Sequence, residues 1–129
     1  MRDFVPRIHA AGAELIIVGN GSPEQARWFV DDYAVQTPVF TDPALVSHRI
    51  VGARRPLFLD PRTLARGAVA MRKGFRQTKT MGSAMQLGGV FVITSDGLMP
   101  YRYLSRFAGD HPDPEDAVRA LEAAAAAPA

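Results

Sequence analysis

Residues 13–27, with the sequence AELIIVGNGSPEQAR, decide the fold class. Residues 14–19 form a nearly continuous apolar run, which is typical of a buried strand covered on both faces of a parallel sheet. Ser22 and Gln25 then show the spacing of a capping box, and Pro23 suits the first position of a helix. The stretch therefore predicts a buried strand followed at once by a helix, as in an α/β domain.

The residues on either side predict two further helices. Phe4, Val5 and Ile8 recur at helical spacing, and Gly12 stands where a helix end favours a left-handed residue. Beyond a short extended segment at 38–40, we expect Asp42 to cap a helix that begins at Pro43 and ends at Gly52. We expect its buried face to comprise Leu45, Val46 and Ile50.

The last third of the chain predicts a β-hairpin and a helix. Residues 89–94 read as a second buried strand, and Asp96-Gly97 is a strong signal for a hairpin turn before a returning strand at 98–104. Asp113 is expected to cap the final helix. The predicted order is helix, strand, helix, irregular segment, hairpin and helix.

The composition excludes several classes of protein. The chain has 129 residues, 47% of them hydrophobic and none of them cysteine, which fits one domain spanning 1–129 without disulfides or thiolate metal sites. Its three histidines (His9, His48 and His111) lack metal-ligand spacing, so we predict no metal and no cofactor. No apolar run approaches the ~20 residues that span a bilayer, and the first residues lack the layout of a secretory signal. We expect a soluble, cytoplasmic protein with no membrane partner.

Positive charge is concentrated in one part of the sequence. Between residues 49 and 79 there is a single acid, Asp60, against nine basic residues: Arg49, Arg54, Arg55, Arg62, Arg66, Arg72, Lys73, Arg76 and Lys79. We expect an irregular basic insert over about 53–87. Such a segment either faces a small anionic ligand or forms a solvated surface. Because no pattern of stacking aromatics accompanies it, we do not predict a nucleic-acid partner.

Four segments carry a resemblance to a known family: residues 13–27, PVFTDP at 38–43, QLGGVFVI at 86–93 and GDHP at 109–112. In this order they resemble the peroxiredoxin-like AhpC/TSA family. The resemblance covers nearly the whole chain and implies a thioredoxin-like sheet with flanking helices.

The resemblance also implies what this sequence lacks. In the family, a β-strand and a cysteine-bearing loop precede the helix that corresponds to residues 2–11. Neither is present here, so the catalytic cysteine of the family has no counterpart and the resemblance implies no thiol peroxidase activity. The missing strand is central in the thioredoxin fold, and its loss would expose two strand edges. We expect a homodimer to bury them; an inward shift of the hairpin, a strand from another protein, or an N-terminal truncation are the alternatives.

His48 and Arg102 are the candidate catalytic residues. A histidine can act as a general base near neutral pH, and an arginine can bind a developing anion through two hydrogen bonds. Tyr101, Arg54 and Arg55 are candidate ligand-binding residues for the same anion. The alternatives are a half-exposed histidine on a helix and side chains chosen for strand propensity.

Gln86, Gly88 and Gly89 are further candidate ligand-binding residues. They resemble the approach to the strand that faces the active site in the family. Paired glycines permit close approach of the backbone to a ligand or to a neighbouring strand. Farther along the chain, Asp110 is expected to order the loop before the last helix through turn hydrogen bonds.

These observations lead to three hypotheses on function. The first is a cysteine-free AhpC/TSA-type protein that binds a small molecule or acts as an accessory protein. The second is a non-redox enzyme of the isomerase, dehydratase or cyclase type that acts on a small acidic metabolite. The third is a truncated fragment of a thiol-dependent antioxidant enzyme.

Overall fold

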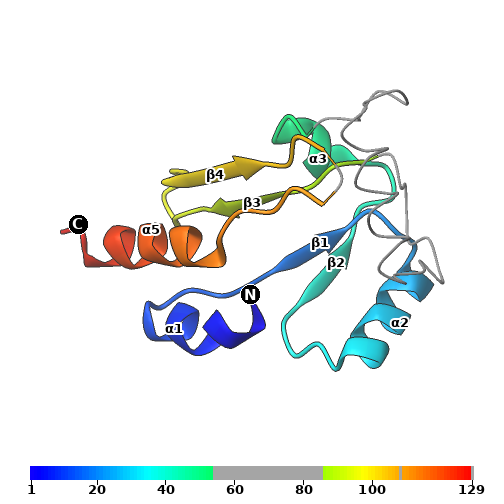
Figure 1. Ribbon diagram of the computed structural model, residues 1–129, viewed down its shortest axis with the longest axis horizontal. Coiled ribbons are helices and arrows are strands. Elements are labelled where there is room, and N and C mark those ends of the chain that lie inside the picture. The colour runs from blue at the N-terminus through cyan, green and yellow to red at the C-terminus, as the bar shows by residue number, and fades with distance from the viewer. Residues whose placement is uncertain (54–85, 108, 129) are drawn as a thin grey trace.

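The computed structural model of the protein describes residues 1–53, 86–107 and 109–128, a mixed arrangement of helices and short strands (Figure 1). In chain order the elements are η1 (Arg2–Phe4), α1 (Val5–Ala10), β1 (Ile17–Gly19), α2 (Pro23–Tyr33), β2 (Val39–Thr41), α3 (Val46–Ile50), β3 (Gly89–Val92), β4 (Tyr101–Leu104) and α5 (Pro114–Ala126). The α/β class is therefore as predicted. Nearly all of the expected basic insert, including Arg54 and Arg55, lies outside the described residues.

The strands form two separate two-stranded sheets. β1 and β2 pair in parallel with Val18 opposite Phe40, and β3 and β4 pair antiparallel with Phe91 opposite Arg102. In the described parts of the chain no ladder joins β1 to β3, although the two strands lie on neighbouring paths and run in opposite directions (Figure 1). The expected exposure of two strand edges is thus what these residues show.

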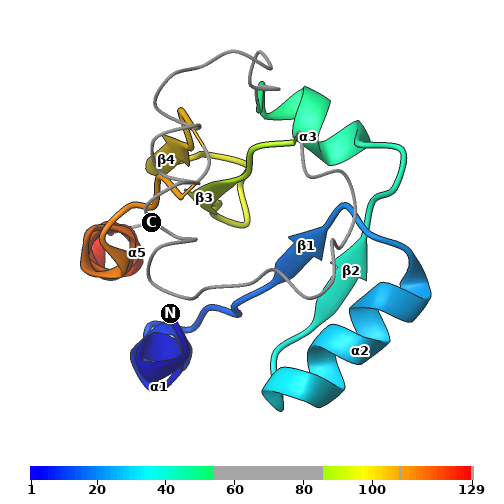
Figure 2. The same cartoon turned by 45° about the vertical axis from the view of Figure 1, so that its right-hand side comes forward.

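Helix α2 begins as the sequence predicts. The Ser22 hydroxyl accepts a hydrogen bond from the Gln25 amide at 3.3 Å, and the Gln25 side-chain oxygen accepts from the Ser22 amide at 2.8 Å. This capping box satisfies two of the amides that a helix start leaves without partners. The helix then packs beside β2, as Figure 2 shows.

One face of the β1–β2 sheet is exposed. Ile16, Val18 and Phe40 keep 53%, 45% and 57% of their surface, and Val18 and Phe40 are direct neighbours in the ladder. The prediction of a strand buried on both faces is therefore wrong for β1. Helix α2 packs against β2 from the side of Val39 and Thr41, and the described residues leave the other face open.

Helix α3 begins later than predicted. Leu45 has a positive φ of 58°, which no helix starting at Pro43 can contain, so the helix begins at Val46. Asp42 still caps it, because its carboxylate accepts from the amides of Val46 at 2.9 Å and Ser47 at 2.7 Å. Leu45 is buried as expected, but Val46 and Ile50 are exposed, Ile50 to 80%. The shifted start turns these two side chains away from the protein.

The best-packed region lies where α5 meets β3, β4 and α1. Val118 on α5 retains only 2% of its surface, and Ala117 and Ile8 are also buried. Arg7 on α1 donates to Glu115 at 2.8 Å and to Glu122 at 2.9 Å, which ties the first helix to the last. These two carboxylates, Glu122 first, raise the pKa of Arg7 well above its usual range.

Candidate functional site

The hairpin and α3 meet through one side chain. Arg102 on β4 donates from Nη2 to the backbone carbonyl of Val51 at 2.8 Å, just after the last residue of α3. A Cβ on the next residue, Gly52, would lie 3.2 Å from the same nitrogen, and Gly52 has a φ of 74°. This glycine ends the helix as predicted and leaves room for the guanidinium. The contact places a cationic group at the carbonyl end of α3, where the helix dipole is negative.

Asp42, Ser47 and His48 form a polar cluster at the start of α3. The Asp42 carboxylate accepts from the Ser47 hydroxyl at 2.5 Å, and its Oδ2 lies 3.5 Å from Nδ1 of His48. The Ser47 hydroxyl, followed by the backbone amides of Val46 and Ser47, holds the pKa of Asp42 well below its usual range. The side chains of His48 and Asp42 are only 13% and 14% exposed. An ionised carboxylate therefore lies beside a largely covered imidazole.

The structure thus brings the two candidate catalytic residues to one region. His48 belongs to α3 itself, and its carbonyl accepts from Ala53 in the turn that closes the helix, at 2.8 Å. Arg102 reaches the end of that turn from β4. The cluster partner Asp42 and the anchor Val51 were not predicted. The sequence signal for Asp42 was its capping position, which was assigned to the helix start alone.

Tyr101 does not share this region with Arg102. Neighbouring residues of a strand point to opposite faces, and Arg102 is exposed whereas Tyr101 and Tyr103 are partly buried. Burial raises the pKa of Tyr101, and the nearby charges of Asp116 and Asp113 on the α5 side add to the effect. The predicted pairing of Tyr101 with Arg102 around one anion is therefore not what the described residues show.

The residues before β3 have distinct local environments. A Cβ on Gly89 would collide with the carbonyl oxygen of Tyr103 and would lie 2.8 Å from the Phe91 ring, whereas a Cβ on Gly88 would meet open space. Gly89 is therefore required for the close approach of β4, one of the two predicted uses. Gln86 donates to the carbonyl of Leu87 at 3.0 Å.

Asp110 orders the loop before α5, as predicted. Its carboxylate accepts from the Tyr103 hydroxyl at 2.6 Å and from the Arg106 amide at 2.8 Å, and its backbone carbonyl accepts from Ser105. These bonds, the Tyr103 hydroxyl first, hold the pKa of Asp110 down at about 2. The network is internal and fixes β4 relative to α5.

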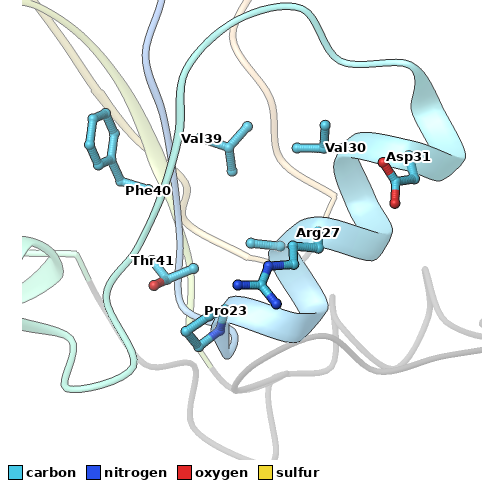
Figure 3. A pocket seen from close by; sticks show the side chains of 8 residues that line it. Pro23, Arg27, Val30, Asp31, Val39, Phe40 and Thr41 are labelled. Atoms are coloured by element: carbon cyan, nitrogen blue, oxygen red, sulfur yellow. The ribbon is translucent and has the colours of Figure 1, made fainter.

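Sequence reasoning did not find a groove between α2 and β2. Its volume is about 610 Å³, and Figure 3 shows Arg27 lying across it toward Thr41, whereas Phe40 points away. Arg27 and Asp31, four residues apart on α2, contribute the charged groups of the lining. Their helical spacing next to the half-buried Ala26 and Val30 is the signal that could have indicated it.

Two negative findings apply to the described residues. No group of histidine and carboxylate side chains within them has the arrangement of a metal site. None of their helices combines the length and the apolar character needed to traverse a bilayer.

Comparison with known sequences identifies the family. The sequence profile of the AhpC/TSA antioxidant enzymes matches residues 1–106, from η1 through β4. The chain belongs to the AhpC/TSA family. No curated protein and no solved structure matches it significantly. The AhpC/TSA match includes both His48 and Arg102, and it ends before α5.

Membership of the AhpC/TSA family defines what these residues cannot do. Thiol peroxidases of this kind need a cysteine thiolate as the nucleophile. None of the 129 residues is a cysteine, so the thiol mechanism is absent from this chain. Any activity at the junction of α3 and β4 has to use nitrogen and oxygen groups.

Proposed function

We propose that this AhpC/TSA-family protein keeps a thioredoxin-like scaffold and binds a small anionic molecule at the junction of α3 and β4, without thiol peroxidase activity. The observation that carries the proposal is the position of Arg102. One N–H of its guanidinium is used by the Val51 carbonyl, and the group has five N–H donors in all. The remaining donors suit a carboxylate or a phosphate.

The sequence around α3 supports the same ligand chemistry. Arg54 and Arg55 follow Gly52 directly in the chain and add cationic groups close by in sequence. The Asp42 charge that would oppose an anion is already engaged by the Ser47 hydroxyl and two backbone amides. A small anionic ligand is therefore favoured over a cationic one.

Native mass spectrometry of the protein purified from its own cells tests this proposal first, because it detects a retained ligand. Titration calorimetry with inorganic phosphate and with malonate then tests the site. Arg102→Gln should weaken binding about tenfold or more, as expected for loss of a bidentate charged contact. Arg119→Gln, which removes an exposed arginine from α5, is the matched control. Equal affinities in the two variants would refute the site.

We further propose that the protein is a homodimer in which the exposed face of β1 and β2 is covered by a second copy. Contiguous exposed apolar side chains such as Ile16, Val18 and Phe40 are typical of interfaces. Sedimentation equilibrium measures the assembly state. A monomeric mass at micromolar concentration would rule the dimer out, whereas a dimer dissociated by Val18→Lys would support it.

A second candidate function rests on the pair formed by Asp42 and His48. A carboxylate beside Nδ1 orients an imidazole and leaves Nε2 to accept a proton from a substrate. Together with the cationic Arg102, this arrangement suits a non-redox isomerisation, dehydration or cyclisation of a small acidic metabolite. If a turnover assay emerges from the retained ligand, His48→Ala should lower kcat at least about a hundredfold. Turnover unchanged in His48→Ala, with His111→Ala as control, would eliminate this role.

A further inference from the structure

An apolar pocket of about 100 Å³ lies between the two sheets. Residues just before β1 line one side of it, among them Ala13, Glu14 and Leu15. Phe91 and Ile93 line the side of β3, and Leu121 on α5 lies along it. The pocket thus separates the two strand edges that the described residues leave unpaired.

The edge of β1 that faces away from β2 carries unpaired backbone groups. Ile17 donates to the carbonyl of Pro38 at 2.9 Å, and the carbonyl of Gly19 accepts from Asp42 at 2.7 Å. Backbone groups alternate in direction along a strand, so those of Ile16 and Val18 are directed to the other edge. Among the described residues they have no hydrogen-bond partner in either sheet.

The same alternation holds for β3. The carbonyl of Gly88 accepts from Ser105 at 3.0 Å, and the amide of Thr94 donates to Leu98 at 2.9 Å. Even-numbered residues therefore bond toward β4, and the backbone groups of Phe91 and Ile93 are directed to the open edge. Two edges with donors and acceptors at alternate residues flank one apolar pocket.

We propose that this pocket accepts a single extended peptide segment of another protein, which adds a strand between β1 and β3. Only a polypeptide offers N–H and C=O groups on both of its sides at the spacing of a strand. Because β1 and β3 run in opposite directions, the added strand runs parallel to one of them and antiparallel to the other (Figure 1). This peptide-binding site is independent of the anion site at α3 and β4.

The lining defines the chemistry of the segment. A volume of about 100 Å³ corresponds to roughly three waters at ~30 Å³ each, which is enough for one aliphatic side chain. Glu14 is the one charged residue that lines the pocket, and its carboxylate lies 3.7 Å from Nε2 of His9 with both side chains more than half exposed. Glu14 precedes β1, so a segment parallel to β1 brings its N-terminal end to this carboxylate. The segment therefore alternates apolar and polar residues and has a lysine or arginine near its N-terminal end.

The test uses the full chain and a fluorescein-labelled synthetic peptide, KTVTLTVTG. Fluorescence anisotropy should show saturable binding, and the same peptide with N-methyl groups on its valines and leucine should bind at least about tenfold more weakly, because N-methylation removes backbone donors and keeps the side chains. In amide exchange followed by NMR, the peptide should slow exchange at Ile16, Val18, Phe91 and Ile93, while Ile17 and Val90 stay unchanged. Absence of binding, or binding that survives N-methylation, overturns the proposal.

Two further measurements separate the alternatives. Glu14→Gln should weaken binding of KTVTLTVTG about two- to fivefold and leave the affinity of the glutamine analogue QTVTLTVTG unchanged, as for an exposed ion pair. Amide exchange without peptide, measured at rising protein concentration, detects a second copy in the pocket. Protection of Val18 and Phe91 that grows with protein concentration would assign the pocket to self-association and overturn the assignment to another protein.

Discussion

Arg102 on β4 donates to the backbone carbonyl of Val51 at the end of α3, and the two residues are 51 positions apart in the chain. This hydrogen bond joins the hairpin to the helix that carries His48. It is the printed side-chain contact through which the described residues hold Arg102 in place, and it gives the proposed anion site a fixed cation.

We expect Arg102→Lys to separate charge from geometry. Lysine keeps the positive charge but lacks the planar fork that can serve Val51 and an anion together. Phosphate binding measured by calorimetry should therefore weaken about as much in Arg102→Lys as in Arg102→Gln. The unfolding free energy should fall by only about 1 kcal/mol in either variant, the usual contribution of one hydrogen bond. Full affinity in Arg102→Lys would show that charge alone suffices.

Replacing the two adjacent glycines before β3 should have unequal effects. Gly89→Ala forces the new methyl group against the Tyr103 carbonyl, so we expect a loss of about 2 kcal/mol in urea unfolding, typical of overpacking. Gly88→Ala meets open space and should change stability by no more than about 0.5 kcal/mol. Equal losses in the two variants would contradict the proximity of β4. A loss of phosphate binding in the stable Gly88→Ala variant would instead indicate a ligand next to Gly88.

Asp110 should make stability depend on acid pH. Its pKa is lowered from 3.8 to about 2 in the folded chain, so the ionised carboxylate stabilises the fold fully above about pH 4. That contribution is lost as the pH falls through about 2. Thermal unfolding should show Asp110→Asn several degrees below the unchanged protein at pH 7, with the difference vanishing near pH 2. Asp32→Asn, at an exposed position late in α2, is the control and should show no such window.

Arg7 should not be replaceable by lysine. Its nitrogens make paired contacts with Glu115, at 2.8 and 3.1 Å, and with Glu122, both at 2.9 Å. A lysine cannot reproduce two forked contacts at once. The midpoint of thermal unfolding should fall nearly as far in Arg7→Lys as in Arg7→Gln, and both deficits should shrink at high salt. Arg119→Gln removes only an exposed pair with Glu115 and should leave the midpoint almost unchanged.

The features that sequence reasoning predicted correctly are local ones. The capping box of Ser22 and Gln25, the cap at Asp113 and the helix end at Gly52 each depend on residues a few positions apart. Such signals act through neighbouring backbone groups and are little affected by the rest of the fold. For the same reason the element order could be predicted in outline.

The features that it missed depend on tertiary context. The left-handed Leu45 moved the start of α3, and no short pattern around residue 45 indicates this conformation. The exposure of Ile16 and Val18 depends on which elements cover the sheet, not on the apolar run itself. At the site, His48 and Arg102 were named, but their contacts with Asp42 and Val51 require the folded arrangement.

The clasp of Arg7 on α5 has a consequence for the kinetics of folding. Its partners Glu115 and Glu122 are 108 and 115 positions away along the chain, so almost the whole polypeptide must be gathered before the clasp can form. Closing so long a loop costs more entropy than pairing β3 with β4, whose strands are joined by a short turn. We therefore expect the hairpin to form early and the docking of the first helix onto the last to come late, so that breaking the clasp speeds unfolding more than it slows refolding.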